Sequence, residues 1–266
     1  MTIMKLRLGK IIALALLGFA IAGPAVAQNP YVILPNGQRV DGTDIRARSD
    51  GTIILTTTQG QVTYEKGRYQ RAEAARPAEF DRALRLAQQR NYDEALTLLE
   101  QVIQNYRFLN WDNQARSLSA QIQMSKGDAA GAVASFERLF QSAPDQKRDS
   151  AALWGYLNAL LGAKQFDKLA PQLGEMIEKG SRADAARAQI MRGDLKLAQG
   201  QVEGAVMDYL RTAMLFESEK TLMPEALFKA ADGLERMRDP RSRELYRRVV
   251  EEFGGTPFAQ RAQAKL

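Results

Sequence analysis

Two patterns of hydrophobic and polar positions divide the chain. In residues 28–69 the apolar positions form short runs rich in β-branched and aromatic side chains, for example residues 31–34 and 53–55. Runs of this kind with partial alternation are typical of strands. Pairs that favour tight turns separate them: Asn36-Gly37, Asp50-Gly51 and Gln59-Gly60. The pattern predicts a small antiparallel β-meander of four short strands.

From residue 78 to residue 266 the apolar positions recur at helical spacing, and residues 70–77 are expected to form a linker. Five polar turns in the helical region are each followed by a position that should be small. These positions are Ala95, Ala132, Leu169, Ala205 and Ser242, at spacings of 37, 37, 36 and 37 residues. A larger apolar or aromatic residue follows each of them after four positions: Leu99, Phe136, Leu173, Tyr209 and Tyr246. The helical region therefore consists of repeated units.

This unit resembles the tetratricopeptide repeat, a helical hairpin with a small residue early in its second helix and an aromatic residue one turn later. The resemblance covers residues 78–266 and implies a mainly α-helical fold, an α-solenoid of about five hairpins. One hairpin cannot bury its own apolar stripe, so neighbouring hairpins stack and coil around a concave face. Leu169, and Leu157 in the first helix of the same unit, are large where the family has small residues. We therefore expect the third hairpin to be open.

The resemblance also implies which first-helix residues face the concave groove. By register they are Ser117, Gln121 and Met124 in the second unit, Trp154, Asn158 and Leu161 in the third, and Arg187, Ile190, Asp194 and Leu197 in the fourth. Trp154 and Asn158 lie one turn apart, so they could hold an extended peptide by covering its apolar surface and bonding its main chain. The alternative, which we favour slightly, is that Trp154 belongs to the core.

The first 27 residues have the features of a secretory signal peptide. Three basic residues and no acidic residue lie in the first ten positions, and the apolar run of residues 11–22 is too short to span a membrane. Ala25-Val26-Ala27 supplies the small residues of a cleavage site. We expect cleavage after Ala27 and export, most simply to a periplasm, with no transmembrane segment in the mature chain. The net charge then falls from +6 to +3.

Composition excludes several kinds of catalysis. The chain has no cysteine and no histidine, which excludes Ser-His-Asp and Cys-His catalysis, thiolate metal sites and HExxH metal sites. The sequence also lacks a nucleophile motif, a phosphate-binding glycine loop and an acidic metal cluster. Acidic and basic residues are interleaved from Asp41 to Lys265, which argues against a nucleic-acid-binding stripe. We therefore expect no enzyme activity, no cofactor, no metal and no nucleic-acid partner.

These features together predict an exported, non-catalytic adaptor or scaffold of a bacterial cell envelope that holds protein or peptide partners. One alternative is a homo-oligomeric structural component. A less favoured alternative is a protein that binds glycan or peptidoglycan in its groove. The β-module adds a further expectation, because an open edge of its sheet could accept a partner strand.

Overall fold

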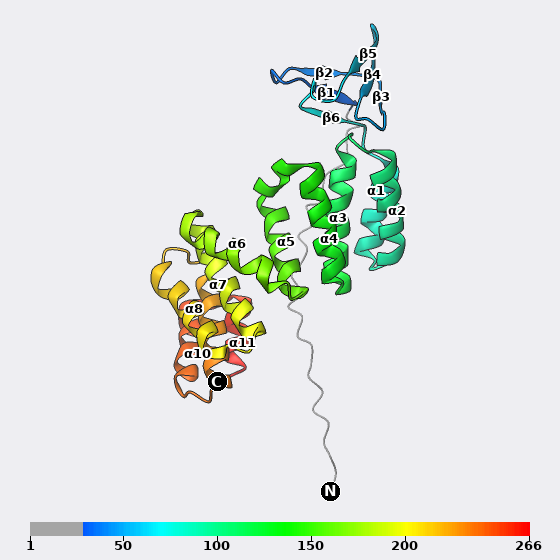
Figure 1. The fold of residues 1–266 in the computed structure, drawn as a ribbon. Helices are drawn as coiled ribbons and strands as arrows, with labels where there is room; N and C mark the ends of the chain where they lie inside the picture. The colour runs from blue at the N-terminus through cyan, green and yellow to red at the C-terminus, as the bar shows by residue number, and fades with distance from the viewer. Residues whose placement is uncertain (1–28) are drawn as a thin grey trace. The chain divides into compact units, whose positions relative to one another are not determined.

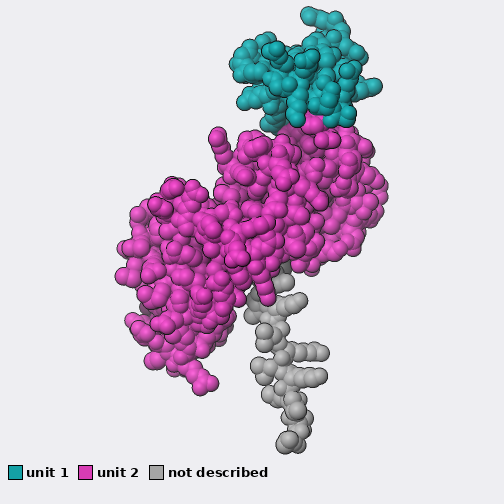
Figure 2. Space-filling model, viewed as in Figure 1, with its two compact units in different colours: residues 1–76 teal, residues 77–266 magenta. Residues whose placement is uncertain are grey.

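The computed structural model describes residues 29–266. The predicted signal segment, residues 1–27, lies outside the described residues. The described residues form two compact units, which divide between residues 76 and 77 (Figure 2). Among the helices of the described residues, none is long and apolar enough to cross a membrane.

The first unit contains two three-stranded antiparallel sheets, with strand orders β2-β1-β6 and β3-β4-β5 (Figure 1). The three predicted turns connect β1 to β2, β3 to β4 and β4 to β5, and the glycine of each has a positive φ. The buried apolar residues of this unit come from both sheets. The strands are β1 (Tyr31–Ile33), β2 (Arg39–Asp41), β3 (Asp44–Ala47), β4 (Ile53–Thr57), β5 (Gly60–Tyr64) and β6 (Arg71–Glu73).

The β-module thus differs from a four-strand meander in two respects. Strand β6 lies inside residues 70–77, the predicted linker, and pairs with β1, while the Tyr31 hydroxyl donates to Glu73 at 2.9 Å. A three-residue strand with two charged residues carries no readable strand pattern. The second difference is at Gly42, where the chain passes from one sheet to the other. A Cβ atom on Gly42 would lie 2.5 Å from Cδ1 of Leu55, so this crossing requires glycine.

The second unit is helical and contains five hairpins, α1–α2, α3–α4, α5–α6, α7–α8 and α9–α10, with α11 packed against the last (Figure 1). A short 3-10 helix, η1 (Pro144–Arg148), precedes α5. The helices are α1 (Ala78–Gln88), α2 (Tyr92–Asn105), α3 (Trp111–Lys126), α4 (Ala129–Ser142), α5 (Ser150–Gly162), α6 (Phe166–Lys179), α7 (Arg182–Ala198), α8 (Val202–Leu215), α9 (Met223–Arg236), α10 (Arg241–Glu252) and α11 (Pro257–Gln263).

The repeat positions predicted from the sequence lie inside the hairpins. All five small-residue positions and all five positions four residues later are buried. In the fourth hairpin, Ala205 is fully buried, and a Cβ atom on Gly193 would lie 2.4 Å from Cε1 of Tyr209. The two helices of this hairpin approach closely because both contact positions are small.

The third hairpin is open. Its helices α5 and α6 contact each other much less than the two helices of any other hairpin, and α6 crosses away from α5 in Figure 1. Leu157 and Leu169 occupy the two contact positions, and both are fully buried. Pro171 lies inside α6, where it removes one helical hydrogen bond. The large side chains at the contact positions predicted an open hairpin, and its two helices do diverge.

Candidate partner-binding surface

The first helices α3, α5 and α7 carry the ten residues predicted to face the groove, and the structure divides them into three groups. Asn158 and Arg187 are exposed, whereas Trp154 and Ile190 are buried. The remaining six are half-buried: Ser117, Gln121, Met124, Leu161, Asp194 and Leu197.

Trp154 is a core residue, so the interpretation of an exposed aromatic beside an amide is wrong. Its side chain is 3% exposed and belongs to the core shared by α4, α5, α6 and α7. Its indole Nε1 donates to Oδ1 of Asp184 at 3.4 Å. Ile190, 3% exposed, is likewise a core residue rather than a groove residue. Residues of α7 cover Trp154, whereas Ile190 packs with residues of α8 and α9. Register alone did not reveal either contact.

Two polar side chains contact Trp154, Arg187 at its ring and Asn158 at its main chain. The guanidinium Cζ of Arg187 lies 4.2 Å from the ring centroid, close enough for a cation–π contact. Burial against its neighbours lowers the pKa of Arg187, while the charges of Glu225 and Asp184 oppose that shift. The Asn158 amide Nδ2 donates to the main-chain oxygen of Trp154 at 2.7 Å, which orients the exposed amide. The buried indole thus lies beneath a polar, hydrogen-bonding surface and is not itself part of that surface.

An ion cluster joins α7 to α9. The Lys229 ammonium lies 2.7 Å from Oδ2 of Asp194 and 2.6 Å from Oε1 of Glu225, and the Tyr209 hydroxyl donates to Oδ1 of Asp194 at 2.8 Å. Burial acts to lower the pKa of Lys229, but the two carboxylates outweigh it and raise that pKa. Lys229 and Glu225 lie in the fifth hairpin, beyond the units to which the groove positions were extended. Ala230, a small first-helix residue next to Lys229, is the signal that could have located them.

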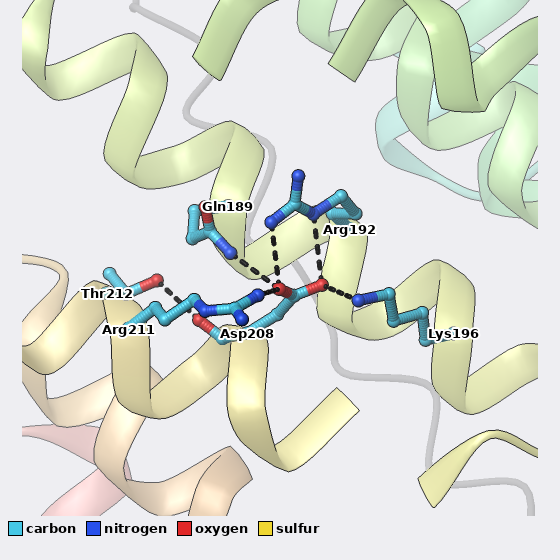
Figure 3. A network of polar contacts seen from close by, with 6 residues as sticks. All are labelled: Gln189, Arg192, Lys196, Asp208, Arg211 and Thr212. Carbon is cyan, nitrogen blue, oxygen red and sulfur yellow. Dashed lines mark hydrogen bonds and ion pairs between the residues drawn. The ribbon is translucent and has the colours of Figure 1, made fainter. Parts of the chain in front are cut away.

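A second cluster surrounds Asp208 on α8, whose side chain is fully buried (Figure 3). Its Oδ1 accepts from Gln189 at 2.8 Å, from Arg192 at 2.9 Å and from Arg211 at 3.2 Å. Its Oδ2 accepts from Arg192 at 3.0 Å and lies 2.7 Å from the Lys196 ammonium. Because Gln189, Arg192 and Lys196 all belong to α7, this carboxylate ties the two helices of the fourth hairpin together.

The protonation state of Asp208 in this second cluster depends on the cations around it. Burial alone would raise the pKa of Asp208, but the hydrogen bonds and charges of Arg192 and Lys196 outweigh it and lower that pKa. The carboxylate is therefore ionised at neutral pH, as a buried charge surrounded by cations should be. Asp208 and its partners fill the face of the fourth hairpin with paired charges. This arrangement links α7 to α8 through one carboxylate and its cationic partners.

The chemistry available on the first-helix surface is that of recognition. Among its charged groups, Asp184 accepts a hydrogen bond from Trp154, Asp194 pairs with Lys229, and Arg187 lies over the Trp154 ring. Within residues 29–266, no group of three or more acidic side chains is placed to hold a metal ion. An amide, a guanidinium and half-buried apolar side chains on neighbouring helices are suited to contact another chain through its main-chain oxygens and apolar residues.

Comparisons with known proteins agree with the repeat architecture. A family model described as tetratricopeptide repeat matches residues 62–107. A crystal structure of a putative kinesin light chain from Podospora anserina with nearly identical tetratricopeptide-like repeats is similar in fold: 19% identity, 71% of this chain and 94% of the other covered, TM-score 0.51. A double mutant of MamA from Desulfovibrio magneticus RS-1 is similar at 18% identity, with 71% and 96% covered and a TM-score of 0.50. Comparison with curated proteins gives no significant match.

Proposed function

We propose that this chain, a tetratricopeptide-repeat protein, is a non-catalytic adaptor or scaffold that holds partner proteins on the first-helix surface of α3, α5 and α7. The observation that carries the proposal is the exposed pair Asn158 and Arg187 beside the buried ring of Trp154. A guanidinium and an amide held by a rigid core can bond the main-chain oxygens of an extended segment with little loss of conformational entropy.

Affinity capture with matched variants tests this function. The purified protein is used as bait, captured proteins are identified by mass spectrometry, and binding of each is then measured with the pure components. The double variant Arg187→Gln with Asn158→Ala should weaken binding about tenfold, which corresponds to about 1.4 kcal/mol. Arg247→Gln changes an exposed arginine on α10 and should leave binding unchanged. Equal binding by all three proteins would refute the assignment of the surface.

We also propose that the protein is exported to the cell envelope. The basic start, the short apolar run and Ala25-Val26-Ala27 support this proposal. Mass spectrometry of the protein isolated from its native cells should find Gln28 at the N-terminus. Recovery of the chain with Met1 intact in the cytoplasmic fraction would contradict it.

Self-association is a second candidate role, and one observation favours it. The outer surface of α8 exposes Met207, Met214 and Leu215, of which the last two are 78% and 60% exposed. Neighbouring exposed apolar side chains are typical of interaction surfaces. Sedimentation equilibrium of the pure protein should show a dimer or larger assembly that Met214→Lys dissociates. If the pure protein is a monomer even at high concentration, self-association is refuted and only the adaptor role remains.

A further inference from the structure

A half-open cavity of about 350 Å³ lies between α4, η1, α5 and α6. Its apolar wall consists of Phe140, Tyr156 and Leu153, and polar groups line the rest. The rings of Phe140 and Tyr156 lie at 86° to each other with centroids 5.4 Å apart. The cavity is located at the open third hairpin, where α6 diverges from α5. Its volume is in the range of sites that bind small organic groups.

The same face of the neighbouring hairpins has less open space. Tyr156 precedes the contact residue of α5 by one position, as Ser119 does in α3 and Arg192 does in α7. In the second hairpin this face holds a smaller cavity of about 140 Å³, which Ser119 lines together with two arginines and a glutamate. In the fourth hairpin Arg192 and Asp208 fill it with their ion pair. Of these three faces, that of the third hairpin presents aromatic rings to a larger open space.

We propose that this cavity binds an aromatic side chain of a partner protein, as an anchor for the adaptor role on which this inference rests. Phe140 and Tyr156 are 6% and 9% exposed, so the parts of their rings that line the cavity form a small aromatic surface against which an incoming ring can pack. The Lys147 ammonium lies 6.0 Å from the centroid of Phe140, at the outer limit for a cation–π contact, and η1 carries it at the rim. An incoming ring beneath that ammonium gains the cation–π contact that Phe140 makes only weakly.

The charges of the cavity select a neutral ring over a cation. Glu137 is the carboxylate of the lining, and it already accepts hydrogen bonds from the Tyr156 hydroxyl at 3.2 Å and from Lys168 at 2.7 Å. A second ammonium or guanidinium group would therefore meet a neutralised carboxylate and the positive charge of Lys147. The amides of Gln141 and Gln172 are the other polar groups of the lining, and Nε2 of Gln172 donates to the main-chain oxygen of Lys168 at 2.9 Å. These amides suit the polar tip of a tyrosine or tryptophan side chain.

Titration of the purified protein with N-acetyltryptophanamide, followed by NMR, tests the cavity directly. We expect saturable binding in the millimolar range, with shifts at Phe140, Leu153 and Tyr156, and binding of N-acetylleucinamide at least fivefold weaker. Lys147→Ala should weaken binding of the tryptophan probe two- to fivefold. Arg148→Ala, the next residue of η1 and not part of the lining, is the matched control and should bind like the wild type.

A blocked variant separates the cavity from other surfaces. Gln172→Trp places an indole of the protein itself at the cavity wall and should abolish probe binding while the protein stays folded, as shown by its circular dichroism. Equal affinity for the tryptophan and leucine probes would overturn the aromatic preference. Probe binding that survives Gln172→Trp, or no saturable binding to the wild type, would overturn the site. Because the probe is free in solution, these outcomes do not depend on whether a partner protein has been captured.

Discussion

The third and fourth hairpins have similar lengths and the same repeat register but different geometry. In the fourth, Gly193 and Ala205 face each other's helices, and α7 and α8 pack closely. In the third, Leu157 and Leu169 occupy those positions, and α5 and α6 diverge. The closed hairpin thus has small residues at both contact positions, and the open hairpin has large residues there.

The two leucines are not defects in the core of the third hairpin. Both are fully buried and belong to an apolar cluster that α4, α5, α6 and α7 share. Although α6 diverges from α5, the two leucines thus remain packed in the core that neighbouring helices share. The divergence of α6 leaves the face beside Tyr156 open, whereas the corresponding face of the fourth hairpin is filled by the Asp208 cluster. A small change at the contact positions can thus create a cavity in a repeat array.

The largest expected effect comes from giving the third hairpin a small residue like those that the other hairpins have at this position. Leu169→Ala should destabilise the protein by about 2–5 kcal/mol, because the open geometry cannot close around the lost side chain. Urea unfolding followed by circular dichroism measures this loss. Met214→Ala, at a side chain that is 78% exposed, is the control and should change stability little. An unchanged midpoint for Leu169→Ala would mean that the hairpin can close.

The reverse substitution should damage the fourth hairpin. Ala205→Leu places a large side chain where α7 and α8 touch, and overpacking of this kind costs about 1–3 kcal/mol. Thermal unfolding of the variant, beside Ala198→Leu at an exposed position of α7, gives the comparison. If the two variants melt at the same temperature as the wild type, close contact at Ala205 is not what holds this hairpin together.

The sequence predicted the helical unit better than the surface it presents. Turns, helix starts and the small residues Ala132 and Ala205 are set by local chemistry and spacing, and these signals repeat. Strand β6 was missed because its pairing with β1 depends on residues far away in the chain. The burial of Trp154 was only weakly favoured because register places a residue on a helix without showing what packs over it. The cavity beside Tyr156 was not foreseen because it depends on the divergence of α6, which Leu169 suggested only in part.

The smallest expected effect concerns alkaline pH and sharpens the contrast at Tyr156. Burial, and then the charge of Glu137, raises the pKa of Tyr156 to about 12, against about 10 in the unfolded chain. The folded state therefore holds this proton more tightly. Its contribution to stability is complete below about pH 10 and is lost as the pH rises toward 12. Tyr156→Phe should lose about 0.5–1.5 kcal/mol at pH 8, where the hydrogen bond to Glu137 is intact, and should decline less steeply between pH 10 and 11.5. Glu137→Gln should reduce the wild-type slope without abolishing it, because burial, the largest single cause of the shift, remains when the charge of Glu137 is removed. Urea unfolding at a series of pH values measures these slopes, and equal slopes for Tyr156→Phe and the wild type would show that Tyr156 titrates alike in both states.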